Sequence, residues 1–204
     1  MVFGKPQIMG KSDKLLTAFK AFDTANAKDP NKEFIEGREY PKELLYAKRM
    51  THILNTFEHK VSEALQLAVR CQHICRWEIP RETYEMNRAG YLKWRQELQS
   101  FHMEKASTIL QSVGYNQKTI ERVCFLMLKK QLKKDIETQI LEDVICLVFL
   151  KYYFDPFLLK HDEDKIITIL RKTWKKMSDK GQRVALLLPY SEKGLDLVHR
   201  ALYN

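Results

Sequence analysis

Residues 136–154, IETQILEDVICLVFLKYYF, decide the fold class of this chain. The stretch is apolar almost all round, as expected for a helix that other helices surround. Elsewhere apolar residues recur at spacings of three and four, which is the helical period. With 7 Gly and 6 Pro, the chain also has few turn formers for an all-β fold. We therefore expect an all-α protein, a single bundle of about seven to nine helices.

Capping residues and prolines bound the expected helices. Ser12 can cap the first helix, Pro41 fits the first turn of the second, and Asn116 can cap the fifth. Residues 26–34, NAKDPNKEF, are expected to form a loop, and Asp155-Pro156 to end the sixth helix. The predicted helices cover residues 12–22, 41–57, 61–77, 91–113, 119–132, 136–154, 161–177 and 192–202.

Length and charge set the domain organisation and the class of partner. A chain of 204 residues is expected to form one helical domain over 1–204, with 1–12 as a flexible or loosely packed N-terminal segment. A net charge of +9 favours phosphates, nucleic acid or anionic membranes as partners. The longest apolar run, 144–150, is too short to cross a bilayer, and the N-terminus does not resemble a signal peptide. We expect a cytoplasmic protein with no membrane partner and with reduced cysteines.

Glu142 and Asp143 are adjacent carboxylates inside the most apolar stretch of the chain. A helix places Asp143 on one face with Ile140, Cys146 and Leu147, so its charge needs a metal, a cationic partner or a raised pKa. One interpretation makes the two carboxylates a metal ligand and a general base. The other makes them part of a structural ion pair with an arginine, and the sequence leaves both open.

Two histidines are candidate metal ligands. His73 lies near the end of a mostly apolar helix, and His102 lies on the next long helix beside Leu98 and Ala106. A neutral imidazole can bind a divalent ion such as zinc, manganese, iron or magnesium, and we expect His73, His102 and Asp143 to share one ion. The alternative is that both histidines are structural.

The segment 76–95, RWEIPRETYEMNRAGYLKWR, mixes arginines with aromatic residues. Arginine binds phosphate through two hydrogen bonds, and an aromatic ring provides a face on which a base or sugar can stack. The alternative is that the rings fill the core while the arginines lie over them at the surface. The substrate-binding residues we predict are Arg76, Arg81, Arg95, Trp77 and Tyr91, with Lys129 from a separate basic cluster.

The order of His52, His73, His102 and Asp143 on successive helices resembles the HD-domain superfamily of metal-dependent phosphohydrolases. In that superfamily, histidines and a late helical aspartate hold a divalent metal inside a helical bundle. The namesake His-Asp pair would fall at His73 and residue 74, where this chain has isoleucine. The resemblance therefore implies a bundle of this kind that lacks one ligand.

A second resemblance extends from about residue 13 to the C-terminus and rests on longer phrases. They are PKELLYAKRM (41–50), CQHICRWEIPR (71–81), RAGYLKWR (88–95), LEDVICLVFL (141–150) and DEDKIITILRKTWKKMS (162–178). These phrases resemble the family designated domain of unknown function 4202. The resemblance implies that His73 and Asp143 belong to the motifs of that family, whereas His52 does not.

Three functions remain open from the sequence. The first is a metal-dependent phosphohydrolase acting on a nucleotide or another small phosphate compound, with Glu142 and Asp143 as the catalytic carboxylates. The second is a non-enzymatic binder of nucleic acid or of a phosphorylated ligand on the same bundle. The third is a helical scaffold. Any binding to nucleic acid is expected to be weak and non-specific, because the basic residues are scattered over several helices.

Overall fold

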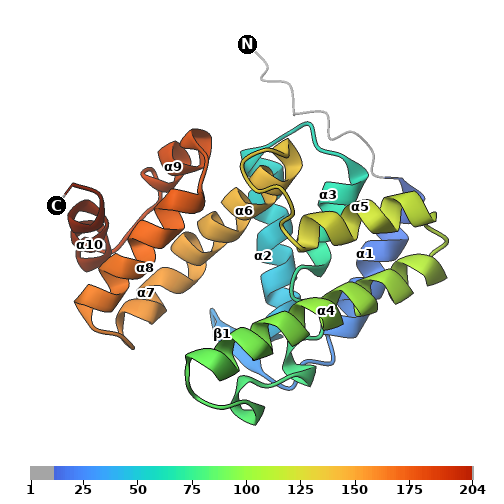
Figure 1. The fold of residues 1–204 in the computed structure, drawn as a ribbon, viewed down its shortest axis with the longest axis horizontal. Helices are drawn as coiled ribbons and strands as arrows, with labels where there is room; N and C mark the ends of the chain where they lie inside the picture. The colour runs from blue at the N-terminus through green and yellow to red at the C-terminus, as the bar shows by residue number, and fades with distance from the viewer. Residues whose placement is uncertain (1–11, 204) are drawn as a thin grey trace.

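The computed structural model describes residues 12–203, which form ten α-helices and one short β-hairpin (Figure 1). Helix α6 (Ile136–Val148) runs between two groups, α1–α5 on one side and α7–α10 on the other. The remaining helices are α1 (Asp13–Asn26), α2 (Lys42–Phe57), α3 (Glu63–Cys71), α4 (Arg88–Ser112), α5 (Gln117–Met127), α7 (Phe154–Leu158), α8 (Glu163–Lys176), α9 (Asp179–Ala185) and α10 (Glu192–Tyr203).

Helix α6 has neighbours on both sides. It packs against α2, α3 and α5 of the first group and against α8 and α9 of the second. Leu141, Val144, Leu147 and Val148 are at most 1% exposed. The apolar pattern of 136–154 therefore arises because helices cover several faces of α6, as the sequence predicts.

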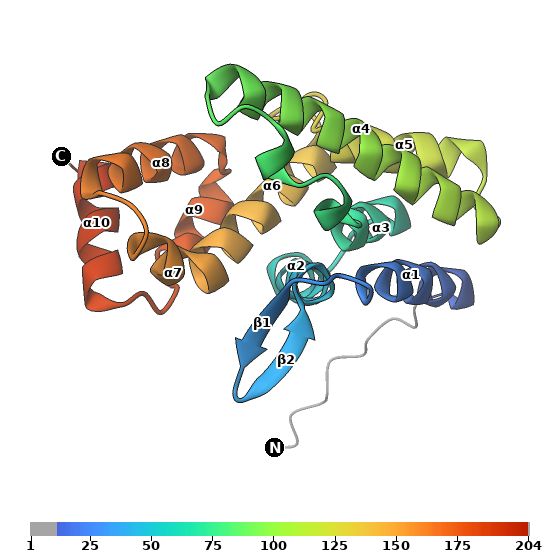
Figure 2. The same ribbon diagram turned by 90° about the horizontal axis from the view of Figure 1, so that it is seen from below.

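The hairpin corrects the expected loop at 26–34. Strand β1 (Lys32–Ile35) pairs antiparallel with β2 (Arg38–Pro41), and the hairpin projects beside α2 (Figure 2). Glu36 and Gly37 form the turn, with φ of 49° and 76°, as tight hairpin turns require. Strands of four residues are too short for alternation to be recognised in the sequence.

Three of the expected helices end several residues earlier in the structure, and the one expected over 61–77 is α3, which ends at Cys71. Beyond Val148 the chain continues through a π-helical turn, Phe149–Tyr153, into α7. Pro156 lies in the first turn of α7, where its missing N–H breaks no helical hydrogen bond. Helix α5 ends at Met127 rather than near 132, and α9 was not predicted.

The predicted N-terminal segment 1–12 lies outside the described residues except for Ser12, which caps α1 by accepting a hydrogen bond from the Leu15 amide. Asn116 likewise caps α5, as predicted. Between residues 12 and 203, no helix has the length and apolarity needed to span a membrane.

Candidate functional site

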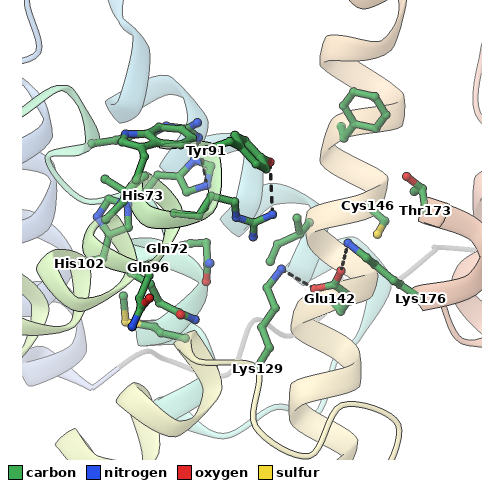
Figure 3. A pocket seen from close by; sticks show the side chains of 18 of the residues that line it. Gln72, His73, Tyr91, Gln96, His102, Lys129, Glu142, Cys146, Thr173 and Lys176 are labelled. Atoms are coloured by element: carbon green, nitrogen blue, oxygen red, sulfur yellow. Dashed lines mark hydrogen bonds and ion pairs between the residues drawn. The ribbon is translucent and has the colours of Figure 1, made fainter. Parts of the chain in front are cut away.

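A cavity of about 550 Å³ lies between the two groups of helices. One wall comes from α4 and from the chain just after α3, and the facing wall comes from α6 and α8 (Figure 3). Its lining includes seven of the residues that the sequence singles out, namely His73, Arg76, Tyr91, Arg95, His102, Lys129 and Glu142.

Positive charge dominates the lining of this cavity. Arg76 and Arg95 lie on the first wall, Lys176 lies on the second, and Lys129 reaches in from the loop between α5 and α6. Glu142 is the acidic residue of the lining. Four cations around one carboxylate leave the cavity with a net positive charge, which favours anions.

Glu142 is paired with two lysines. Its side chain is 2% exposed, its Oε2 lies 2.5 Å from Lys129 Nζ, and its Oε1 lies 3.5 Å from Lys176 Nζ. The pairing offsets the desolvation of the buried carboxylate and draws the α5–α6 loop and the end of α8 towards α6. The structural ion pair considered in the sequence analysis is therefore present for Glu142, with lysines in place of an arginine.

Lys129 owes its position to the way α5 ends. The Lys129 amide donates to Leu126 O and the Lys130 amide to Phe125 O, with Lys129 at φ 52°. This is the Schellman arrangement, in which the left-handed residue is usually glycine. A lysine there is strained by roughly 1–2 kcal/mol, because its Cβ crowds the following carbonyl oxygen. Its side chain reaches Glu142.

His102 is buried with a fixed tautomer. Its Nδ1 lies 2.7 Å from the carbonyl oxygen of Ile74, which can only accept, so Nδ1 carries the hydrogen and Nε2 is a bare acceptor. Burial is the main cause that lowers the pKa of His102 to about 3, and the ring is therefore neutral near pH 7. Nε2 is buried and has no hydrogen-bond partner among residues 12–203.

His73 lies beside His102, with 6.0 Å between the ring centroids. Its ring stacks on Tyr46 at 4.2 Å, and its Nδ1 lies 3.6 Å from Glu43 Oε2. Burial, followed by the nearby Arg76 guanidinium, lowers the pKa of His73 well below its usual range. The ring is therefore neutral, and its contact with Glu43 is not an ion pair.

Glu43 was not singled out from the sequence. It is 6% exposed, and burial raises the pKa of its carboxyl group. Its position in α2 carries a recognisable signal, because Glu43, Ala47, Met50 and Leu54 follow helical spacing and all four are buried. A carboxylate on an apolar helix face could have been recognised in the same way as Asp143.

Asp143 is not among the residues that line the cavity, and it joins α6 to the start of α9. Its Oδ1 accepts from the Ser178 amide at 2.8 Å and from Gln139 Nε2 at 3.1 Å, and its Oδ2 accepts from Ser178 Oγ at 2.5 Å. Ser178 in turn caps α9 by accepting from the Gly181 amide. The carboxylate accepts from neutral donors, and burial raises its pKa. Of the three outcomes that the sequence allows for its charge, the raised pKa is the one found.

The predicted metal ligands are not brought together. Within the part of the chain that the structure describes, no group of three or more His, Cys, Asp or Glu side chains is placed to hold a metal ion. His73 and His102 lie on one wall of the cavity, but Asp143 is engaged by Ser178 and Gln139. The residues present do not fit the predicted three-ligand site.

Two of the predicted substrate-binding residues lie elsewhere. The guanidinium group of Arg81 donates to the carbonyl oxygens of Tyr84 and Glu85, and so folds its own loop. Trp77 lines a second cavity, together with Phe101 and Lys105. The prediction that one continuous segment forms a wall is wrong at these two positions, because short 3-10 turns at 76–78 and 81–83 redirect the chain.

Fold and site together define a mainly helical protein with a cationic, partly aromatic cavity. The chain belongs to the family described as domain of unknown function (DUF4202), whose model matches residues 16–198. No curated protein matches the chain. No solved structure matches it either.

Proposed function

We propose that this protein binds a phosphate-containing small molecule in the cavity between α4 and α6. The observation that carries the proposal is the set of four cations, Arg76, Arg95, Lys129 and Lys176, that line one cavity with a single carboxylate among them. Phosphate oxygens accept hydrogen bonds from arginine and lysine, and such charge-assisted bonds are stronger than neutral ones.

The two arginines are free to bind an anion. In residues 12–203 neither Arg76 nor Arg95 forms an ion pair with a carboxylate. Arg76 lies over the Trp94 ring at 5.2 Å and contacts the His73 ring, while Arg95 reaches the Tyr91 hydroxyl at 3.5 Å. Aromatic contacts of this kind orient a guanidinium group and leave its charge uncompensated.

The aromatic side chains favour an organic phosphate. Tyr91 is 42% exposed and lines the cavity beside Trp94. An exposed ring next to cationic side chains can stack against a base or a sugar while the phosphate is held. A volume of about 550 Å³ is typical of sites for small organic ligands.

Calorimetric titration with AMP and with inorganic pyrophosphate tests the proposal. We expect both to bind, and we expect Arg95→Gln to weaken binding about tenfold or more through the loss of one charge-assisted contact. Arg183→Gln is the matched control, because Arg183 is exposed on α9 outside the cavity. If neither AMP nor pyrophosphate binds, the proposal is wrong. Tighter binding of a single-stranded oligonucleotide than of AMP would favour the nucleic-acid alternative.

A metal-dependent phosphohydrolase of HD-like type is the second candidate for the same cavity. It is favoured by the two neutral imidazoles of His73 and His102 on one wall. Because Asp143 is engaged elsewhere, we assign no chemical step to a metal. Release of phosphate from AMP, measured with and without added Mn²⁺ or Zn²⁺ for wild type and His73→Ala, tests this candidate. Equal rates for the two proteins would exclude a role for His73.

A further inference from the structure

The polar groups of the cavity fall into two sets. The cations Arg76, Arg95, Lys129 and Lys176 are hydrogen-bond donors, and they suit the phosphate of the proposed ligand. His102 and Gln72, on the wall that also carries Arg76 and Arg95, each present an acceptor that has no partner among the described residues. The phosphate group of a monoester dianion offers only acceptor atoms, so by itself it cannot satisfy this second set.

The acceptor of His102 is the better defined of the two. The side chain is 6% exposed, the Nδ1–H is committed to the Ile74 carbonyl, and the Nε2 lone pair has no partner in residues 12–203. A buried acceptor without a partner destabilises the folded protein. Native structures keep such groups where a ligand or a water completes them.

Gln72 supplies a second acceptor on the same wall. It precedes His73 in the sequence and also lines the cavity. Its buried Oε1 likewise lacks a partner among the described residues. Figure 3 shows Gln72, His73 and His102 together on the wall that faces Glu142 and Lys176. Arg76 and Arg95 also lie on this wall, and Lys129 and Lys176 belong to the rest of the lining. A ligand in the cavity therefore meets both cations and bare acceptors.

We propose that the ligand is a phosphorylated sugar or polyol, whose hydroxyl groups donate to His102 Nε2 and Gln72 Oε1 while its phosphate binds the cations. An amine would also donate, but an ammonium group would be repelled by the four cations of the lining. A neutral hydroxyl group can donate to the two acceptors and is not repelled by the four cations. This inference rests on the proposed function and adds the chemical class of the ligand.

The test compares phosphates that differ in their hydroxyl groups. Ribose 5-phosphate, glucose 6-phosphate, glycerol 3-phosphate and AMP are titrated calorimetrically beside ethyl phosphate and inorganic phosphate. We expect at least one hydroxylated compound to bind tenfold or more tightly than ethyl phosphate. If none binds more than twofold more tightly, water alone completes the two acceptors and the inference is wrong.

Two variants test whether the acceptors of Gln72 and His102 cause the higher affinity of the hydroxylated compounds. Gln72→Met keeps the length of the side chain and removes the acceptor, and His102→Phe keeps a ring and removes Nε2. Each is expected to lower the affinity for the preferred hydroxylated compound at least fivefold and to leave ethyl phosphate unchanged. Gln111→Met, at an exposed position of α4, is the control and should change neither affinity. A variant that weakens both compounds equally would contradict the assignment.

The two proposals can fail separately. If inorganic phosphate, ethyl phosphate and every hydroxylated compound fail to bind, both the proposed function and this inference are wrong. If the simple phosphates bind and the hydroxylated ones gain nothing, only the inference on ligand class is wrong. Circular dichroism of each variant shows whether it folds, and Gln72→Met gives the decisive comparison if His102→Phe does not.

Discussion

Two regions of the molecule bury polar side chains but satisfy their hydrogen bonds differently. One is the contact between α6 and α9, and the other is the histidine wall of the cavity, which carries His73 and His102. Asp143 receives three hydrogen bonds from Ser178 and Gln139. His102 makes one hydrogen bond through Nδ1 and leaves Nε2 bare, within the part of the chain that is described. A fully paired buried group stabilises a fold, whereas a half-paired group lowers stability and is available to a ligand. Asp143 is therefore fully paired within the fold, whereas His102 keeps an acceptor that the proposed ligand would complete.

Glu142 shows how closely these two roles can lie in the sequence. It precedes Asp143 by one residue, yet it faces the cavity and its two lysines. Successive residues on an α-helix point about 100° apart, because 3.6 residues complete a turn. Helix α6 therefore supplies one carboxylate to the cavity and the next to the contact with α9.

Removal of the Asp143 carboxylate is expected to have the largest effect on stability. Asp143→Ala leaves the Ser178 amide, the Ser178 hydroxyl and Gln139 without their acceptor, and should lower the free energy of unfolding by about 3 kcal/mol. Urea unfolding followed by circular dichroism measures the loss. A change below 1 kcal/mol would show that water replaces the carboxylate and would remove one side of the comparison.

Gly181→Ala tests the same contact from α9. A Cβ at position 181 would lie 2.6 Å from Asp143 Oδ1, so we expect a loss of about 2 kcal/mol from overpacking. Helix propensity alone predicts the opposite sign, a gain of about 1 kcal/mol for alanine. A double-mutant cycle with Asp143→Ala separates the two effects, because the clash disappears when the carboxylate is absent. Equal losses in both backgrounds would contradict the assignment.

His102, on the wall of the cavity that carries the two histidines, should make the free energy of unfolding depend on pH. The unfolded chain binds a proton to His102 near pH 6.5, whereas burial lowers its pKa to about 3 in the folded protein. Below pH 6.5 the unfolded state binds more protons, so the free energy of unfolding falls as pH falls from 6.5 towards 3. Within this range, each unit by which the pH falls lowers the free energy of unfolding by up to about 1.4 kcal/mol.

His102→Phe should reduce that acid sensitivity. His73 has a lowered pKa and acts in the same direction as His102, whereas Glu43 and Asp143 have raised pKa values and act in the opposite direction. All three groups are present in both proteins, so the difference between wild type and variant reports the removal of His102. Urea unfolding at pH 7, 6 and 5 is the measurement. Parallel curves for the two proteins would mean that His102 takes up its proton in the folded state.

The cavity arginines are expected to have the smallest effect on folding. Arg95 is exposed and forms no ion pair in residues 12–203, so Arg95→Gln should change the free energy of unfolding by less than about 0.5 kcal/mol. The same substitution is expected to weaken phosphate binding. A large loss of stability would show that Arg95 stabilises the fold, as Asp143 does, and is not held free for a ligand.

The sequence by itself determined the helical class, the buried course of α6 and the caps of α1 and α5. These features depend on apolar spacing and on side chains that bond to backbone amides three residues away, and such signals act within a few residues. It also indicated seven of the residues that line the cavity, because buried or clustered ionisable groups stand out against an apolar helix.

Only the tertiary structure decided the partners of those residues. Asp143 meets Ser178 and Glu142 meets Lys176 because α8 and α9 fold back on α6, and their spacing along the chain does not show it. Arg81 turns to its own loop because the carbonyl oxygens of Tyr84 and Glu85, just after the second 3-10 turn, accept from its guanidinium group. The choice among a metal, an arginine and a neutral donor depends on which segment arrives from a distance, and packing of the whole chain settles that choice.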